Sequence, residues 1–325
     1  MLKTGGFLFF FFCINLCCLG QRPGDYRYYH QQMIHADQYI ARERYREALS
    51  VMDRVFAQYP FIFLRDYQIA AQLAALIGDQ PKAIEYIKAG AADGWDLAAI
   101  DRVQLFRKFK ADPAWRELVQ QYPQLHRRYL QRLDLPMQKE LRQMFQDDQR
   151  LASKNAAIED EQAQDVFLLQ RFVPQSERQI KRLQELMIQK GYPGEKRIGN
   201  ASWAQVVLSH HNSISPAYVK QDQLYPALRP LLLRAISTGD LSPGDFAIME
   251  DWRIDVSSDH KISSYGYIHT LKASDLTKCD QLRQAIGLPS VALRNELIDV
   301  QQKTGINFYW EGTTWVKGKM KVQKN

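Results

Sequence analysis

Residues 67–95 read YQIAAQLAALIGDQPKAIEYIKAGAADGW, and alanine and larger apolar residues recur there at helical spacing on both sides of a Gly78-Asp79 turn. Ala70 and Ala74 before the turn, and Ala83 after it, are small enough to let two helices approach closely. The segment therefore predicts a pair of short packed helices, which is one unit of a helical array.

The flanking sequence extends this pattern. Apolar residues at helical spacing run from Tyr39 to Val55, and Tyr59-Pro60 ends that element because proline disfavours a helical residue before it. Beyond the unit, bulky side chains suited to covering the apolar end of a stack are Phe106, Phe109, Trp115 and Leu118. Residues 39–118 resemble tetratricopeptide repeats, although the Trp and Pro positions of the full consensus are missing.

The second half of the chain is also predicted to be mostly helical. We expect helices over 137–153, from Ser176 (with Gln179 completing a capping box) to Gly191, and from Ser202 and Ser242 onward. Near the end, Glu311-Gly312 separates two aromatic and β-branched runs, which predicts a β-hairpin. The fold class is thus mainly α, and the expected parts are a leader (1–20), a repeat domain (21–132), a helical domain (133–305) and a hairpin with a basic tail (306–325).

The first twenty residues differ from the rest. Lys3 precedes an apolar run from Phe7 to Leu19, which is typical of a signal peptide and shorter than the ~20 apolar residues of a membrane span. We expect an exported protein, periplasmic or secreted. Lipid anchoring in the envelope through Cys17 or Cys18 is the alternative, and only then would the membrane be a partner.

Composition sets further limits. The 325 residues are 46% hydrophobic and 24% charged, which allows two domains with ordinary cores. The net charge of +7 is modest, and export also argues against nucleic acid as a partner. Removal of the leader leaves Cys279 as the single thiol, which is more typical of a packed side chain than of a nucleophile.

The chain has no nucleotide-binding loop, zinc-ligand pair or serine elbow, so the sequence predicts neither a metal nor a cofactor. The weaker candidates lie in the second half. Four could carry catalysis, namely His210, Asp251, Arg253 and Asp148. Four more could contact a ligand, namely His211, Gln149, Glu250 and Tyr265.

His210 shares a helical stripe with Trp203, Val206 and Val207, and His211 lies at the edge of that stripe. A buried imidazole beside a carboxylate could act as a general base or a metal ligand. The alternative is a core histidine that a backbone carbonyl or an acid satisfies.

Arg253 falls on the same helix face as Phe246 and Met249. Burying its charge requires an acidic partner. The available acids are Glu250, Asp148 and Asp251.

Residues 137–268 carry a second resemblance. The order of their motifs is Asp148-Gln149-Arg150, Gly191-Tyr192-Pro193, Ile198-Gly199, His210, Ala247 to Asp251, and Tyr265-Gly266. This order is similar to that of a bacterial family known as domain of unknown function 6624. That family tends to show Gln-His, Asp-Arg and Tyr-Gly-Thr-Gln, whereas this chain has Ser209-His210, Asp251-Trp252 and Tyr265-Gly266-Tyr267-Ile268. The resemblance implies a helical domain of exported or repeat-bearing proteins and brings no established activity.

Two functions are compatible with these patterns. The array predicts an exported scaffold that binds a protein or peptide partner, because helical arrays usually bind rather than catalyse. The alternative is an envelope enzyme or small-ligand domain in which His210, Asp148, Asp251 and Arg253 converge from separate helices.

Overall fold

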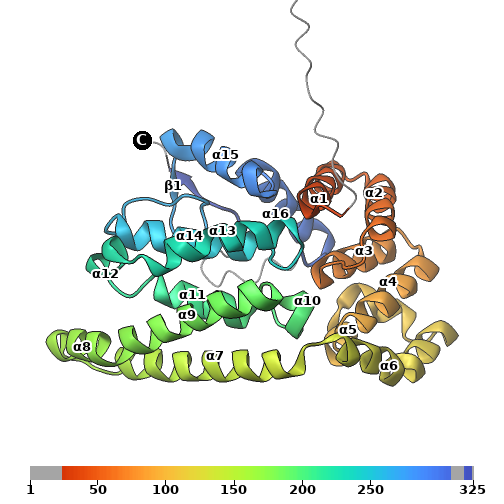
Figure 1. Ribbon diagram of the computed structural model, residues 1–325. Helices are drawn as coiled ribbons and strands as arrows, with labels where there is room; N and C mark the ends of the chain where they lie inside the picture. The colour runs from red at the N-terminus through yellow and green to blue at the C-terminus, as the bar shows by residue number, and fades with distance from the viewer. Residues whose placement is uncertain (1–23, 309–317, 324–325) are drawn as a thin grey trace, which may run out of the picture.

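The computed structural model describes residues 24–308 and 318–323, and within them the chain is mainly α-helical, as the sequence predicted (Figure 1). The predicted signal peptide lies outside the described residues. None of the helices described is both long and apolar enough to cross a membrane.

The N-terminal helices form two packed pairs. Helix α1 (Tyr26–Ala41) packs against α2 (Tyr45–Gln58), and α3 (Leu64–Leu76) packs against α4 (Gln80–Ala92). Ala70, Ala74 and Ala83 have no exposed surface, so their small side chains permit the close approach predicted from the sequence. Gly78 makes the turn with a φ of +80°, and the Asp79 side chain caps α4 by accepting the Lys82 amide.

Bulky side chains close the other side of this array. They come from α5 (Leu97–Arg102), the 3-10 helix η1 (Gln104–Phe109) and α6 (Pro113–Arg132). Phe106, Trp115 and Leu118 are buried in the same hydrophobic cluster as α1 to α4. Helix α6 ends at Arg132, where the sequence predicted a domain boundary, and that boundary stays a prediction.

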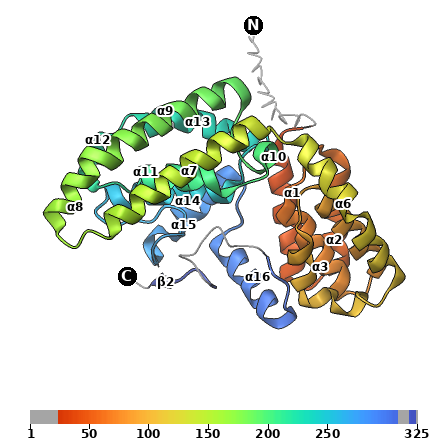
Figure 2. The ribbon, with the colours of Figure 1, turned by 90° about the horizontal axis from the view of Figure 1, so that it is seen from below.

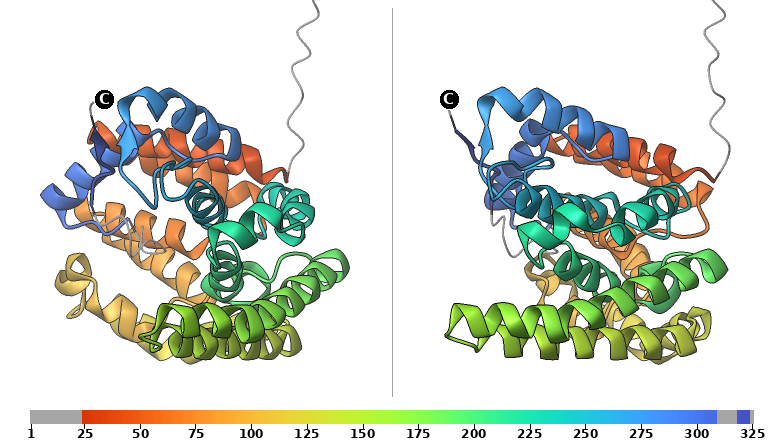
Figure 3. Two further views of the ribbon diagram at one scale, coloured as in Figure 1. Left: turned by 90° about the vertical axis from the view of Figure 1, so that its left-hand side faces the viewer. Right: turned by 60° about the vertical axis from the view of Figure 1, so that its left-hand side comes forward.

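A long hairpin of helices follows. It consists of α7 (Leu135–Ala156), α8 (Glu161–Phe167), the π-helical turn η2 (Leu168–Phe172) and α9 (Val173–Lys190), which Figure 3 shows as a layer under the other C-terminal helices. The predicted start of α9 at Ser176 is wrong. The chain is already helical through η2, so α9 needs no N-terminal cap. Ser176 lies inside α9, and its hydroxyl is hydrogen-bonded to Nδ1 of His211.

The middle layer contains α10 (Glu195–Ile198), α11 (Ser202–His211), α12 (Pro216–Gln221), α13 (Leu224–Ser237) and α14 (Pro243–Ser257). Ser242 caps α14 as predicted, because its hydroxyl accepts the Asp245 amide at 3.1 Å. Helix α11 begins at Ser202, as expected, but the capping oxygen is the Asn200 side chain rather than the Ser202 hydroxyl.

The last elements return the chain to its beginning. They are β1 (Leu271–Lys272), the 3-10 turn η3 (Ala273–Asp275), α15 (Leu276–Ile286), α16 (Val291–Thr304) and β2 (Val322–Gln323), and the two short strands pair in parallel. The turn expected at residues 311–312 lies outside the described residues.

Helix α16 lies beside α1, and its Leu297 and Val300 join the N-terminal cluster (Figure 2). The Gln72 side chain of α3 also binds the backbone of Asn307 in both directions, at 2.9 Å each. The two halves of the chain are therefore packed together, and a cavity forms between them.

Candidate functional site

The cavity has a volume of about 600 Å³ and lies between the N-terminal and C-terminal helices. Its walls come from α1, the start of α3, α7, α10, α11 and the start of α14, together with the turn at 287–289. Apolar surface is supplied by five aromatic rings, namely Phe63, Phe145, Tyr192, Trp252 and Tyr267. A concave, largely apolar space with a few polar groups is the usual form of a small-molecule site.

His210 and Asp148 meet at this cavity. The Nδ1 atom of His210 lies 2.6 Å from Oδ2 of Asp148, and Gln149 donates to the same oxygen at 3.2 Å. Asp148 is 2% exposed, whereas the His210 side chain is 32% exposed and lines the cavity with Gln149. The carboxylate thus fixes the orientation of an accessible imidazole whose other nitrogen, Nε2, stays available.

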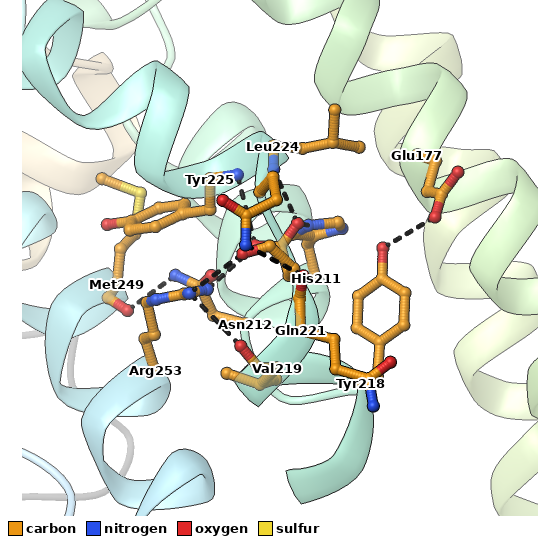
Figure 4. A network of polar contacts seen from close by, with 12 residues as sticks. Glu177, His211, Asn212, Tyr218, Val219, Gln221, Leu224, Tyr225, Met249 and Arg253 are labelled. Atoms are coloured by element: carbon orange, nitrogen blue, oxygen red, sulfur yellow. Dashed lines mark hydrogen bonds and ion pairs between the residues drawn. The ribbon is translucent and has the colours of Figure 1, made fainter.

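The two histidines have the opposite placement from the one expected. His211 rather than His210 is fully buried, and it belongs to a polar network that Figure 4 shows between α9, α11, α12 and α14. Its Nδ1 lies 2.8 Å from the Ser176 hydroxyl and its Nε2 lies 3.3 Å from Asp222 Oδ1. His211 is thus a core histidine with a hydroxyl at Nδ1 and a carboxylate near Nε2, although Nε2 makes no aligned hydrogen bond within the described residues.

Arg253 belongs to that same network. Its guanidinium donates to Asp222 at 2.9 Å and to the Val219 carbonyl at 3.2 Å (Figure 4). Burial alone would raise the pKa of Asp222, but His211, the Leu224 amide and Arg253 together lower it to about 2. Arg253 has the buried acidic partner that the sequence required, and that partner is Asp222.

Asp251 has a different task from the one considered in the sequence. Its carboxylate accepts the backbone amides of Ser264, Tyr265 and Tyr267 at 2.7, 2.6 and 2.6 Å. Burial raises the pKa of Asp251 to about 6, against the opposing effect of these amides. The residue holds the loop that follows α14 and brings Tyr267 to the cavity wall.

The other candidates also have partners inside the fold. Glu250 accepts a hydrogen bond from the Tyr225 hydroxyl and forms an ion pair with Arg229, both at 2.8 Å. Tyr265 is buried, and its carbonyl accepts Arg283 at 2.7 Å. Cys279 is a buried free thiol whose pKa burial raises to about 12, which matches the inert role expected.

Carboxylates that the sequence reading did not single out also line the cavity. They are Asp37, Asp66, Glu195, Asp240 and Asp245, and among the described lining residues Arg65 is the single permanently cationic side chain. Asp240 pairs with Lys196 and Arg197, which lie outside the lining, at 3.2 Å each. Arg65 Nε lies 3.5 Å from Asp66 Oδ1. Burial raises the pKa of Asp37 and of Glu195 to about 7 and that of Asp245 to about 6. This end of the cavity has more acids than nearby cations to balance them.

Four buried polar atoms of lining residues make no hydrogen bond within the described part of the chain, and two of them, on Asp66 and Asp240, lie in ion pairs. His30 Nε2 and the Tyr192 hydroxyl are buried, and neither makes a hydrogen bond within the described part of the chain. Burial, assisted by the charge of Arg65, lowers the pKa of His30 to about 3, so this imidazole is neutral. Burying a polar group without a hydrogen bond costs roughly 1–3 kcal/mol, which a bound polar molecule would recover.

Comparisons with protein-family models, with curated proteins and with solved structures find no match to this chain. The likenesses to tetratricopeptide repeats and to domain of unknown function 6624 therefore stay predictions. The geometry of the cavity is the observation that points to a function.

Proposed function

We propose that the protein binds a small organic cation in the cavity between its two halves and that His210 acts on the bound molecule as a general base. The observation that carries this proposal is the His210–Asp148 pair at the wall of a cavity that also holds an excess of carboxylates. The proposal keeps His210 and Asp148 from the small-ligand alternative that the sequence left open. It reverses the ligand charge, because Arg253, which was expected to hold an anionic substrate, is paired with Asp222 and does not line the cavity.

The His210–Asp148 geometry suits proton transfer. A carboxylate on Nδ1 selects the tautomer with its hydrogen on that atom and stabilises the imidazolium that forms when Nε2 accepts a proton. Nε2 would take this proton from water or from a hydroxyl of the ligand. The Gln149 side chain donates to the same carboxylate oxygen and so helps to keep the pair in place.

The acidic residues define the ligand charge. Asp37, Asp66 and Asp245 all lie within the electrostatic influence of Arg65, but one guanidinium cannot balance them together with Glu195. Buried carboxylates that share one site resist ionisation, and a nearby positive charge favours it. An amine or guanidine at this end would therefore be stabilised by the ionisation that it promotes.

Helix α11 sets the length of the ligand. Ser202, at its first turn, and His210, near its last turn, both line the cavity. These two residues are eight positions apart, which corresponds to about 12 Å along the helix axis at a rise of about 1.5 Å per residue. We assign the reacting group of the ligand to the His210 end of this span and its cationic group to the carboxylates of the wall.

A protein or peptide partner, which the sequence favoured, was expected on the concave inner face of the array. The cavity supports the small-ligand role instead, because its volume is in the range of roughly 300–1,000 Å³ usual for small-molecule pockets.

Binding can be tested with paired probes. The mature chain would be titrated calorimetrically with N-acetyl-arginine methyl ester and with N-acetyl-norleucine methyl ester, which keeps the ester and lacks the guanidinium. We expect binding of the first only, and release of methanol if His210 activates water for attack on the ester. Glu195→Gln and Asp37→Asn should weaken binding, whereas the exposed-site control Glu159→Gln should not.

The role of His210 has its own test. His210→Gln should keep the fold and the binding of the arginine ester but abolish methanol release. Equal binding of both esters would contradict the cation assignment. Unchanged methanol release by His210→Gln would contradict the role of the base.

A further inference from the structure

A second group of side chains lies at the far end of α14. Asp255 on the last turn of this helix faces His260 and His269 in the loop that follows. One ligand-type atom from each of the three residues lies within 4.8 Å of the other two. We propose that these residues bind one divalent transition-metal ion, with zinc as the reference ion, and so fasten the loop to α14.

The carboxylate of Asp255 is buried and directed at both imidazoles. His260 Nδ1 lies 2.7 Å from Oδ2, and His269 Nε2 lies 2.5 Å from Oδ1. Asp255 is 1% exposed, and its Oδ1 accepts no hydrogen bond within the described residues despite the nearness of His269. Asp255 Oδ1 and His269 Nε2 thus lie close together but are not aligned for a hydrogen bond. Such an arrangement is expected of two atoms that both bind one metal ion.

A sharp bend in the backbone brings the histidine side chains close to the Asp255 carboxylate. Asp259 and His260 have φ values of +53° and +60°, in the left-handed region that non-glycine residues seldom adopt. Two such residues in succession cost free energy, and they persist where the surroundings fix them. The bend turns the chain back onto α14, where the His260 amide donates to the Asp255 carbonyl at 2.8 Å.

The donor set indicates the class of ion. Two imidazoles and one carboxylate suit zinc and its first-row neighbours, whereas calcium and magnesium prefer oxygen alone. Two atoms bound to one tetrahedral zinc lie about 3.3 Å apart, given metal–ligand bonds of about 2.0–2.2 Å. The two imidazoles are 58% and 45% exposed, so they can move by the small amount required.

The position of the cluster explains why the sequence reading found no metal site. His260 and His269 are nine residues apart in a loop, which matches none of the usual helical ligand spacings. The turn at 259–260 brings them to one carboxylate. The same loop contains Tyr267, so the ion would help Asp251 to hold one wall of the cavity.

The test uses the untagged mature chain after treatment with a chelator and dialysis. We expect wild type to take up one zinc per chain, to gain thermal stability with zinc and not with magnesium, and to give a tetrahedral spectrum with cobalt(II). The double variant His260→Gln/His269→Gln should lose all three responses. These histidines are exposed, so the variant should fold as well as wild type without metal.

Two controls locate the ion. His35→Gln removes an exposed histidine elsewhere, and His210→Gln removes the cavity base; both should keep the zinc and the cobalt spectrum. Zinc uptake that is absent in wild type, or equal in wild type and the double variant, would overturn the proposal. Loss of zinc in His210→Gln alone would place the ion in the cavity and would also overturn it.

Discussion

Glu195 Oε1 accepts a hydrogen bond of 2.7 Å from the backbone amide of Leu64. Leu64 begins α3 and Glu195 begins α10, so a side chain from the C-terminal half caps a helix of the N-terminal half. An acidic side chain at a helix N-terminus satisfies an unpaired amide and interacts favourably with the helix dipole. This contact also fixes Glu195 beside the cavity.

Glu195→Ala should therefore destabilise the protein by about 1 kcal/mol, the usual effect of losing a helix cap. Glu195→Gln should retain most of that stability, because its amide oxygen can accept the same hydrogen bond. Chemical denaturation at pH 7 would measure both. Equal stability of the alanine variant and wild type would show that the contact does not stabilise the fold.

Asp37 should make stability depend on pH. Burial raises its pKa from 3.8 to about 7, so the unfolded chain releases this proton first as the pH rises. The native state then loses stability between about pH 4 and pH 7, and the loss is complete above that range. Asp37→Asn removes this pH dependence, so it should stabilise the protein more at pH 8 than at pH 5. We expect a difference on the order of 1 kcal/mol, kept small because water in the cavity screens the charge.

Thermal unfolding of Asp37→Asn at several pH values checks this expectation, with Glu159→Gln as the exposed control. A pH profile that coincides with that of wild type would contradict the raised pKa of the half-buried Asp37.

Gly199 is expected to tolerate no side chain. Its φ is +65°, and a Cβ there would lie 1.8 Å from the Tyr129 hydroxyl, which contacts the Gly199 carbonyl at 3.2 Å. Gly78 has a φ of +80° with open space around it, so Gly78→Ala provides a control for backbone strain alone. Gly199→Ala should cost more than the roughly 1 kcal/mol expected of the control.

Unfolding free energies of Gly199→Ala, Tyr129→Phe and the double variant would separate the clash with the Tyr129 hydroxyl from the backbone strain at Gly199. The double variant should recover part of the loss, because Phe lacks the clashing hydroxyl. Additive costs would argue against this clash.

Asp251→Asn should loosen the loop after α14. The carboxylate accepts three backbone amides, and an asparagine would direct its own NH₂ group at one or more of them. We expect a loss of about 2–4 kcal/mol, typical of charge-assisted hydrogen bonds that are broken in a buried site. Hydrogen exchange of the Ser264, Tyr265 and Tyr267 amides should accelerate before global unfolding. Unchanged protection of these amides would contradict the proposed role of Asp251.

Local features of the fold were predictable from the sequence. The small residues Ala70, Ala74 and Ala83 and the Gly78 turn predicted the packed helix pair, because helix spacing and turn chemistry act over a few residues. Ser242 likewise predicted the start of α14, since a cap bonds to an amide three residues later. The start of α9 was missed because the π-helical turn before it keeps the chain helical without a cap.

The candidate site was predictable only in part. His210 and Asp148 were named as candidates, but a stripe pattern cannot resolve which of two adjacent histidines faces the core, and the packing of α9 and α12 buries His211 instead. Arg253 was expected to need an acid. The structure pairs it with Asp222, which is distant in sequence and brought near by α12.

By itself, the sequence determined the helical class, the packed pair of α3 and α4, and the starts of α11 and α14, because each depends on neighbouring residues. Tertiary structure decided that His210 is the accessible histidine of the two. Tertiary structure alone decided the cavity, its excess of acids and the Asp255–His260–His269 cluster. Asp37, Asp66, Glu195 and Asp245 come from four helices, α1, α3, α10 and α14, which contacts between the two halves bring to one cavity, such as those of α1 with α13 and α16 and of Glu195 with Leu64. Their shared electrostatics depend on distances through space, and spacing along the chain does not encode those distances.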